Sequence, residues 1–372
     1  MRALAGILLV LALAPPAAAE TVARRTAAAG PALAGDTVAW GEETRAGAVQ
    51  VLRGAPGASP QLVHEIPAAT AAKTRRGFMS YPSSFAASAE AFAALTVTAT
   101  VTDEGFDHVT ETSEQAAVGG PLPGPGALLG GSIPERVVPG CQGVADGVTG
   151  VDVDAGRIAV ARYTVACDSD GPPQLSISVH DATGRRDVPV SGGLDIITVR
   201  IAGDYLLWVQ RDLRSRDEIV LYDLARGAEV RRVRMRDLRS HDGRDAALQA
   251  DGTVAFAFSR RLGGLKFGSR LAWFSAADPR LRVVAMRGWI GKLALRDGRV
   301  LYEHELRARW ASEVVLRPLG GKPRRLARYG ARRSLVGTLD LDATRAVWAV
   351  EPRRPSDDQP TGRPGRIVLR TL

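Results

Sequence analysis

The chain has 372 residues, 45% of them hydrophobic and 24% charged, and its formal net charge at pH 7 is +9. Beyond the N-terminal segment no apolar run reaches the ~18 residues of a membrane-spanning helix, so no transmembrane segment is expected. The length fits two or three ordinary domains or one repeat domain. Only four of the 49 cationic residues are lysines, which indicates codon bias in a GC-rich genome as much as selection for an anionic partner.

Residues 1–19 have the pattern of an export signal. Arg2 precedes an apolar run from Leu4 to Ala14, and a small-residue cleavage pattern ends at Ala19, before Glu20. We therefore expect a signal peptide at 1–19 and a secreted or periplasmic, extracytoplasmic location for the remainder.

One short pattern recurs along the second half of the chain. Each copy has an alternating apolar run, a tight Asp/Gly turn and a second run rich in β-branched and aromatic residues, which is typical of a β-hairpin. The turn positions Gly156, Gly203, Gly252, Gly298 and Thr344 are 47, 49, 46 and 46 residues apart. Such a near-constant spacing indicates a repeat architecture.

Two further strands follow each hairpin, as in 313–319 and 322–330. Four short strands in ~47 residues correspond to one blade of a β-propeller. Residues 32–43 fit the hairpin of the first blade and 84–101 that of the second. The Gly/Pro-rich sequence after it is interpreted as an insertion loop at about 115–146.

The two ends of the repeat region complement each other. The last repeat contains three strands, 338–342, 346–351 and 366–372, and lacks the outer one. Residues 21–29 have no other role and are predicted to supply that strand, closing the ring. The fold class is therefore all-β, a single β-propeller over 20–372 with about seven four-stranded blades; six or eight blades are the alternatives.

The phrase from Asp297 to Ala327, with an Asp-Gly turn, a hydrophobic strand and a strand ending at Gly320-Gly321, resembles the TolB-like propeller repeat. The resemblance covers most of 148–372 and, weakly, 30–115. The chain departs from that family in lacking Ser-Pro before Asp-Gly. The resemblance implies the fold, and extracytoplasmic binding only loosely, because propellers carry many unrelated functions.

Two residue types have positions that predict structural roles. Aromatic residues follow the turns at Trp40, Trp208, Phe256, Tyr302 and Trp348, which predicts packing between blades. Cys141 and Cys167 lie at similar distances on either side of the third hairpin turn. In an oxidising compartment this placement predicts a disulfide.

Catalytic and metal sites have little support in the sequence. The acidic pairs Asp152/Asp154, Asp168/Asp170, Asp340/Asp342 and Asp357/Asp358 fit no known oxygen-ligand loop and are interpreted mostly as turn formers or solvated strand residues. Nucleophile-elbow, dinucleotide-loop and zinc-protease motifs are absent, and the five histidines are scattered. No catalytic residue, metal site or cofactor is expected.

Arginines concentrate in two places. Those on predicted outer strands, such as Arg231, Arg232, Arg324 and Arg325, are interpreted as charges that protect an open sheet edge. Others lie in the long loops after the second strand of each blade, which should emerge on one face and bind an anionic group. The candidate ligand-binding residues are Arg211, Arg214, Arg216, Arg260, Arg261, Lys266, Arg307, Arg309, Arg353 and Arg354.

Two hypotheses for function follow. The first is a non-enzymatic binding module or scaffold, monomeric, that recognises a protein or an anionic cell-envelope polymer; nucleic acid is not expected as a partner. The alternative is a propeller enzyme, a lyase or hydrolase, with its site at the central pore. A cluster of His, Asp, Glu or Tyr at the starts of the inner strands would favour the enzyme, and the sequence displays none.

Overall fold

The computed structural model describes most of the chain after residue 18. The described residues are 19–24, 29–68, 74–78, 84–103, 109–122, 124, 126–131, 144–166, 172–240, 243–263, 266–286, 288–306, 311–330, 333–352 and 365–372.

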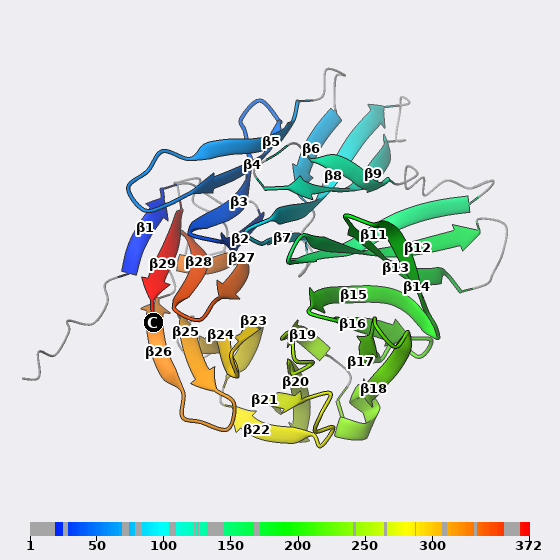
Figure 1. The fold of residues 1–372 in the computed structure, drawn as a ribbon, viewed down its shortest axis with the longest axis vertical. Coiled ribbons are helices and arrows are strands. Elements are labelled where there is room, and N and C mark those ends of the chain that lie inside the picture. The colour runs from blue at the N-terminus through cyan, green and yellow to red at the C-terminus, as the bar shows by residue number, and fades with distance from the viewer. Residues whose placement is uncertain are drawn as a thin grey trace, which may run out of the picture.

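These residues form seven antiparallel sheets arranged as blades around a common centre (Figure 1). Blade 1 contains β2 (Ala29–Ala34), β3 (Thr37–Glu43), β4 (Val49–Gly54) and β5 (Gln61–Ile66). Blade 2 contains β6 (Thr74–Phe78), β7 (Phe85–Ala87), β8 (Ala91–Asp103), β9 (Val109–Pro121) and β10 (Ala127–Gly131). Blade 3 contains β11 (Val144–Asp154), β12 (Arg157–Ala166), β13 (Gln174–Asp181) and β14 (Gly184–Val190).

The remaining blades follow the same plan. Blade 4 contains β15 (Gly193–Ala202), β16 (Tyr205–Asp212), β17 (Asp217–Asp223) and β18 (Ala228–Arg234), followed by the short 3-10 helix η1 (Met235–Leu238). Blade 5 contains β19 (Gly243–Leu248), β20 (Val254–Gly263), β21 (Lys266–Phe274) and β22 (Arg282–Met286). Blade 6 contains β23 (Trp289–Arg296), β24 (Arg299–Leu306), β25 (Ala311–Pro318) and β26 (Arg324–Tyr329). Blade 7 contains β27 (Arg333–Leu341), β28 (Arg345–Pro352), β29 (Arg366–Thr371) and β1 (Ala19–Ala23).

The predicted hairpins are confirmed. In each blade the inner strand, nearest the centre, turns tightly into the second strand, and Gly35, Gly156, Gly203 and Gly298 occupy these turns with positive φ. Gly203 shows why glycine is needed, because its φ is 52° and a Cβ there would lie 2.5 Å from the carbonyl oxygen of Ala250 in the next blade. The spacing that revealed the repeat thus marks real contacts between turns.

The aromatic positions are buried between blades, as expected. Trp40, Phe256 and Trp348 have 0% exposure, and Tyr302 and Trp208 have 1% and 3%. Each belongs to a hydrophobic cluster that includes residues of the neighbouring blade. The core of the ring therefore consists of a series of such clusters, one at each seam between blades.

Blade 2 corrects the sequence interpretation. The inner hairpin is β7–β8, as predicted, but much of the expected insertion at 115–146 is strand: β9 runs to Pro121, β10 occupies Ala127–Gly131, and β11 begins at Val144. Gly119 and Gly126 explain the misleading composition, because a Cβ at either would lie within 3 Å of Phe92 atoms. Glycine here permits close packing. The additional strand β6 pairs with the second half of β8 and was not predicted.

The ring is closed by the N-terminal strand. β1 pairs antiparallel with β29, with Thr21 opposite Val368 and Ala23 opposite Ile367, and becomes the outer strand of blade 7 (Figure 1). The strand is Ala19–Ala23, somewhat earlier than the predicted 21–29. Val22 and Ala23 are buried in a cluster with Trp40 of blade 1 and Ile367 of blade 7, which explains why the strand stays in place.

Several predictions fall outside the described residues. They include the signal peptide, apart from Ala19, and both cysteines, so the disulfide stays a prediction. β11 and β12 are paired as far as Val144 and Ala166, three residues and one residue from Cys141 and Cys167. Within the described part of the chain, no helical segment has the length and apolarity that crossing a membrane requires.

Candidate functional site

The inner strands surround a central cavity of about 160 Å³. Most of its wall comes from the last residues of the inner strands, next to the turns that lead to the second strands. We call this side of the disc the turn face, and the opposite side, where second and third strands connect, the loop face. The charged residues lining the cavity are Asp152, Asp154, Arg200, Asp245, Lys292, Arg296 and Asp340.

Four cavity carboxylates bridge consecutive blades. Asp152 Oδ2 and Asp154 Oδ2 accept hydrogen bonds from Ile201 N and Gly203 N of blade 4, at 2.7 and 2.8 Å. Asp245 Oδ2 accepts one from Leu293 N of blade 6 at 2.9 Å. In the same way, Asp340 Oδ2 accepts one from Leu33 N of blade 1 at 2.7 Å. Each of these seams therefore has a carboxylate that holds the backbone of the next inner strand.

Other cavity residues also reach into the next blade. Arg200 Nη2 donates to Asp245 Oδ1 at 3.2 Å, across the seam between blades 4 and 5. Lys292 Nζ donates to the carbonyl of Leu335 at 3.1 Å, and Thr338 Oγ1 to that of Pro31 at 2.9 Å. Most polar groups in the cavity wall thus form hydrogen bonds between neighbouring blades.

Burial changes the acidity of Asp152, Asp245 and Asp340. Desolvation raises the pKa of Asp152 to about 7 and that of Asp340 to about 6, and it also raises the pKa of Asp245. The Arg200 guanidinium opposes this shift at Asp152 and Asp245 without cancelling it. Asp152 and Asp340 were interpreted from the sequence as turn formers or solvated residues, and that interpretation is wrong for both.

Of their neighbours, Asp342 forms a turn, as expected, whereas Asp154 Oδ2 accepts a hydrogen bond from Gly203 N of blade 4. Asp342 Oδ1 accepts hydrogen bonds from the backbone of Thr344 and Arg345, at 2.7 and 2.6 Å. Arg345 also bonds Asp342 and donates to the carbonyl of Gly35 in blade 1. In blade 3, Arg157 pairs with Asp154 and donates to Gly203 O of blade 4. Some of the many arginines therefore connect the turn of one blade to the next blade.

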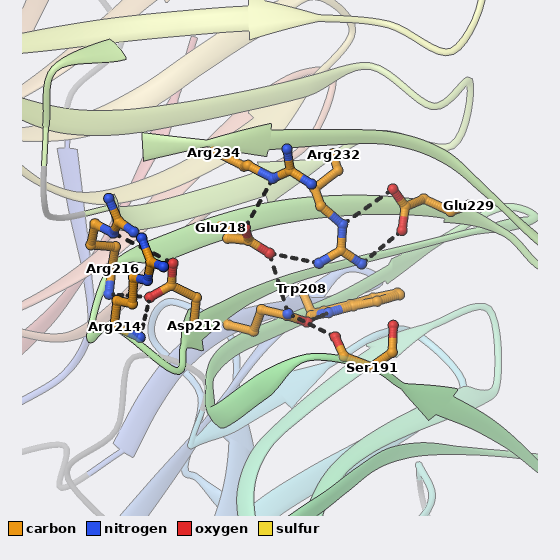
Figure 2. Close-up of polar contacts among 10 residues, drawn as sticks. Ser191, Trp208, Asp212, Arg214, Arg216, Glu218, Glu229, Arg232 and Arg234 are labelled. Atoms are coloured by element: carbon orange, nitrogen blue, oxygen red, sulfur yellow. Dashed lines mark hydrogen bonds and ion pairs between the residues drawn. The ribbon is translucent and has the colours of Figure 1, made fainter. Parts of the chain in front are cut away.

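A polar network connects the core of blade 4 to its outer strand (Figure 2). The indole Nε1 of Trp208 donates to Gln210 Oε1 at 2.7 Å, and Gln210 Nε2 donates to Ser191 O at 3.1 Å. Next to it, Glu218 is only 8% exposed and accepts from Arg232 Nη1 at 2.6 Å. These contacts leave the buried carboxylate well compensated.

The outer-strand arginines complete this network. Arg234 Nε lies 3.3 Å from Glu218 Oε1, and Arg232 Nη2 also lies 2.8 Å from Glu229 Oε2. Blade 6 repeats the arrangement, since Glu313 contacts both Arg325 and Arg328 of its outer strand. These arginines neutralise the buried Glu218 and the half-buried Glu313 of their own blades, a role beyond the edge protection expected from the sequence.

Replacing Glu218 with alanine is expected to lower the free energy of unfolding by about 2 kcal/mol, because two arginines lose their buried partner. Replacing Glu229, which contacts the same Arg232 from a more exposed position, should cost less than about 1 kcal/mol. Urea unfolding of both variants measures the difference. Equal effects would show that Glu218 has no special place in the network.

The structure describes three of the predicted loop-face arginines. Arg211 is exposed near the end of β16, with its Nε 3.6 Å from Asp217 Oδ1. Asp212 shapes the turn by accepting from the backbone of Arg214 and Arg216, at 2.8 and 2.9 Å (Figure 2). Arg216 folds back onto Asp212, with 3.5 Å between charged atoms. The turn between β16 and β17 therefore presents Arg211 and Arg214 to solvent.

An apolar residue completes this tip. Leu213 has 59% exposure between Asp212 and Arg214. No described carboxylate lies within 4.0 Å of the Arg214 guanidinium, in contrast to Arg232 and Arg234 of the outer strand. We call Arg211, Leu213 and Arg214 the blade 4 tip.

The other predicted arginines are only partly placed. The segment 259–269 was expected to be a loop, but β20 and β21 continue through it as a hairpin, with Arg260 opposite Gly268 and Gly263 opposite Lys266. Arg261 lies on the same hairpin, and the described structure does not extend to the side chains of these three cationic residues. Arg307, Arg309, Arg353 and Arg354 lie outside the described residues altogether.

Comparison with known proteins supports the fold alone. No protein family model matches the sequence, and no curated protein is detectably similar to it. Among solved structures, a puromycin hydrolase superposes with a TM-score of 0.55 at 14% identity, covering 93% of this chain and 52% of that one. A Mycobacterium tuberculosis puromycin-hydrolyzing peptidase gives a TM-score of 0.51 at 13% identity, covering 94% and 56%. The chain thus spans about half the length of these proteins.

Proposed function

We propose that this chain is an extracytoplasmic, non-enzymatic binding propeller that recognises an anionic polymer of the cell envelope through its loop face. The observation that carries the proposal is the blade 4 tip. There, the exposed guanidinium groups of Arg211 and Arg214 flank an exposed leucine. Arg211 lies 3.6 Å from Asp217, whereas Arg214 has no described carboxylate within 4.0 Å. On the outer strands, Arg232 and Arg234 contact Glu218, and Arg325 and Arg328 contact Glu313. Guanidinium groups suit phosphate and carboxylate ligands.

The position of the tip supports the same proposal. The blade 4 tip stands on the loop face of a rigid ring, and such positions commonly carry binding residues. The sequence places more cationic residues at the corresponding positions of blades 5, 6 and 7: Arg260, Arg261, Lys266, Arg307, Arg309, Arg353 and Arg354. A surface with several such positions would bind a polymer better than a single small anion, because each contact adds to the others.

The enzyme alternative has a weaker basis. The described polar groups of the central cavity are mostly held in bonds to the next blade, which leaves little freedom for an acid–base pair to act on a substrate. The puromycin-hydrolysing proteins share the fold at 13–14% identity, and this chain spans only about half of their length, so their activity is not carried over.

The extracytoplasmic location is part of this proposal. It is supported by the export-signal pattern at 1–19 and by the resemblance of the repeat to TolB-like propellers.

Charge reversal at the blade 4 tip tests the proposal. The variant Arg211→Glu/Arg214→Glu should elute from phosphocellulose at a much lower salt concentration than the unmodified protein, because attraction to the polymer is lost. The matched control is Arg185→Glu/Arg226→Glu, which makes the same change of charge at exposed arginines away from the loop face. If both variants lose equal retention, only net charge matters and the proposal fails. Retention on an acidic protein column but not on phosphocellulose would point instead to a protein partner.

A further inference from the structure

We propose that the carboxylates of the central cavity make the fastening of the ring depend on pH, so that the blades are held more firmly under mildly acidic conditions than above neutrality. This inference concerns the scaffold and does not depend on the ligand proposed above.

The geometry places these carboxylates at the seams. Asp152 joins blades 3 and 4, Asp245 joins blades 5 and 6, and Asp340 joins blades 7 and 1, each through the backbone N–H of the next inner strand. Asp245 and Asp340 also accept from the N–H of the following residue in their own strand, at 2.8 and 2.7 Å. The carboxylates are therefore held in place at the seams by hydrogen bonds to backbone N–H groups.

Charged groups from several elements face these carboxylates. Arg200 on β15 acts on both Asp152 and Asp245, while Asp340 on β27 repels Asp152. Lys292 on β23 acts on Asp245.

Asp340 has its own surroundings. Arg296 on β23 attracts it, and Asp342 on its own strand repels it. For all three carboxylates, burial outweighs these cations, and the neutral form is favoured.

The direction of the effect follows from linkage. The pKa values of Asp152 and Asp340, about 7 and about 6, lie above the ordinary 3.8. A group of this kind stabilises the fold fully below its unfolded pKa and loses that contribution as the pH rises through the folded pKa. Stability from Asp152 and Asp340 is therefore lost between about pH 4 and pH 8.

Groups whose pKa is lowered act in the opposite direction, and the two half-buried histidines do so nearest neutrality. Burial lowers the pKa of His64 and His180 below 6.5, so their contribution to stability is lost as the pH falls below that value. The pH dependence of the whole protein therefore mixes both effects. A comparison between variants isolates the carboxylates.

The experiment compares the full chain with Asp152→Asn and Asp340→Asn at pH 5 and pH 8 by urea unfolding. Between these pH values, ionisation of Asp152 should lower the folding equilibrium constant of the unmodified protein about 100-fold, and that of Asp340 about tenfold. Asparagine keeps an acceptor oxygen without the charge. Each variant should therefore gain stability relative to the unmodified protein at pH 8 and lose this advantage at pH 5. Asp187→Asn, at an exposed position, is the control and should show no such change.

A second measurement serves if a variant does not fold. Hydrogen exchange of the Ile201 and Leu33 amides in the unmodified protein, corrected for intrinsic rates, should show more frequent opening at pH 8 than at pH 5. The proposal is overturned if the difference in stability between the unmodified protein and the variants is the same at both pH values, or if opening of these amides does not change with pH.

Discussion

Removal of residues 20–23 is expected to shift the urea midpoint of unfolding far below that of the intact chain. The deletion takes away most of β1, which pairs with β29 and buries Val22 and Ala23 in the seam between blades 7 and 1. Burial of one valine contributes about 2 kcal/mol, and each backbone hydrogen bond about 1 kcal/mol. The expected loss is about 5 kcal/mol, a large part of the ~5–15 kcal/mol that usually stabilises a domain.

Two point variants separate closure from a general effect of shortening the chain. Val22→Asp leaves the strand in place but inserts a charge into the buried cluster, and it should reproduce much of the loss. Glu20→Ala changes an exposed side chain of the same strand and should have little effect. A deletion variant that unfolds at the same urea concentration as the intact chain would falsify the closure of the ring by β1.

Truncation of Trp348 is the second change with a large expected effect. Its side chain has 0% exposure in the cluster between blades 6 and 7, and its Nε1 donates to Tyr329 Oη at 2.7 Å. Trp348→Ala should lower the free energy of unfolding by about 3–5 kcal/mol, because it removes a large apolar contact and leaves a cavity.

The matched control is Trp289→Ala, at a half-buried tryptophan of blade 6. It should be markedly less destabilising than Trp348→Ala, and chemical denaturation followed by circular dichroism measures both. Similar losses in the free energy of unfolding would mean that the five repeated aromatic positions contribute no more to stability than a half-buried tryptophan.

Local patterns made the fold predictable. The turn glycines and the aromatic residues recur at nearly equal intervals, because the blades share the same short inner hairpin and pack against their neighbours in the same way. The incomplete last repeat also predicted the closing strand. The turns and aromatic positions depend on neighbours in the sequence, and the closing strand followed from the missing strand of the last repeat. Each of these features was found in the structure.

The carboxylates of the cavity were not predictable in this way. Asp340 and Asp342 are two residues apart and look alike in the sequence, but Asp340 accepts a hydrogen bond from Leu33 N of the next blade, whereas Asp342 accepts one from Thr344 N of its own turn. Asp152 and Asp154, in contrast, both accept from the backbone of blade 4, at Ile201 N and Gly203 N. Which role an aspartate takes depends on the strand packed against it, about fifty residues away or, for Asp340, at the other end of the chain.

Glycine-rich composition misled in blade 2 for a related reason. Gly119 and Gly126 suggested a loop, but they leave room for Phe92, and only the packed structure shows that contact. Likewise, the role of Arg232 and Arg325 on the outer strands could be assigned only from the structure, which places Glu218 and Glu313 beside them.

The closing strand also bears on the order of folding. Thr21 pairs with Val368, and these residues are 347 positions apart in the chain. Blades 1 to 6 are each built from neighbouring segments, so they can assemble progressively, whereas blade 7 must wait for both ends of the chain to meet. We therefore expect the β1–β29 pair to form late, and partial unfolding of the native ring to begin at the same place.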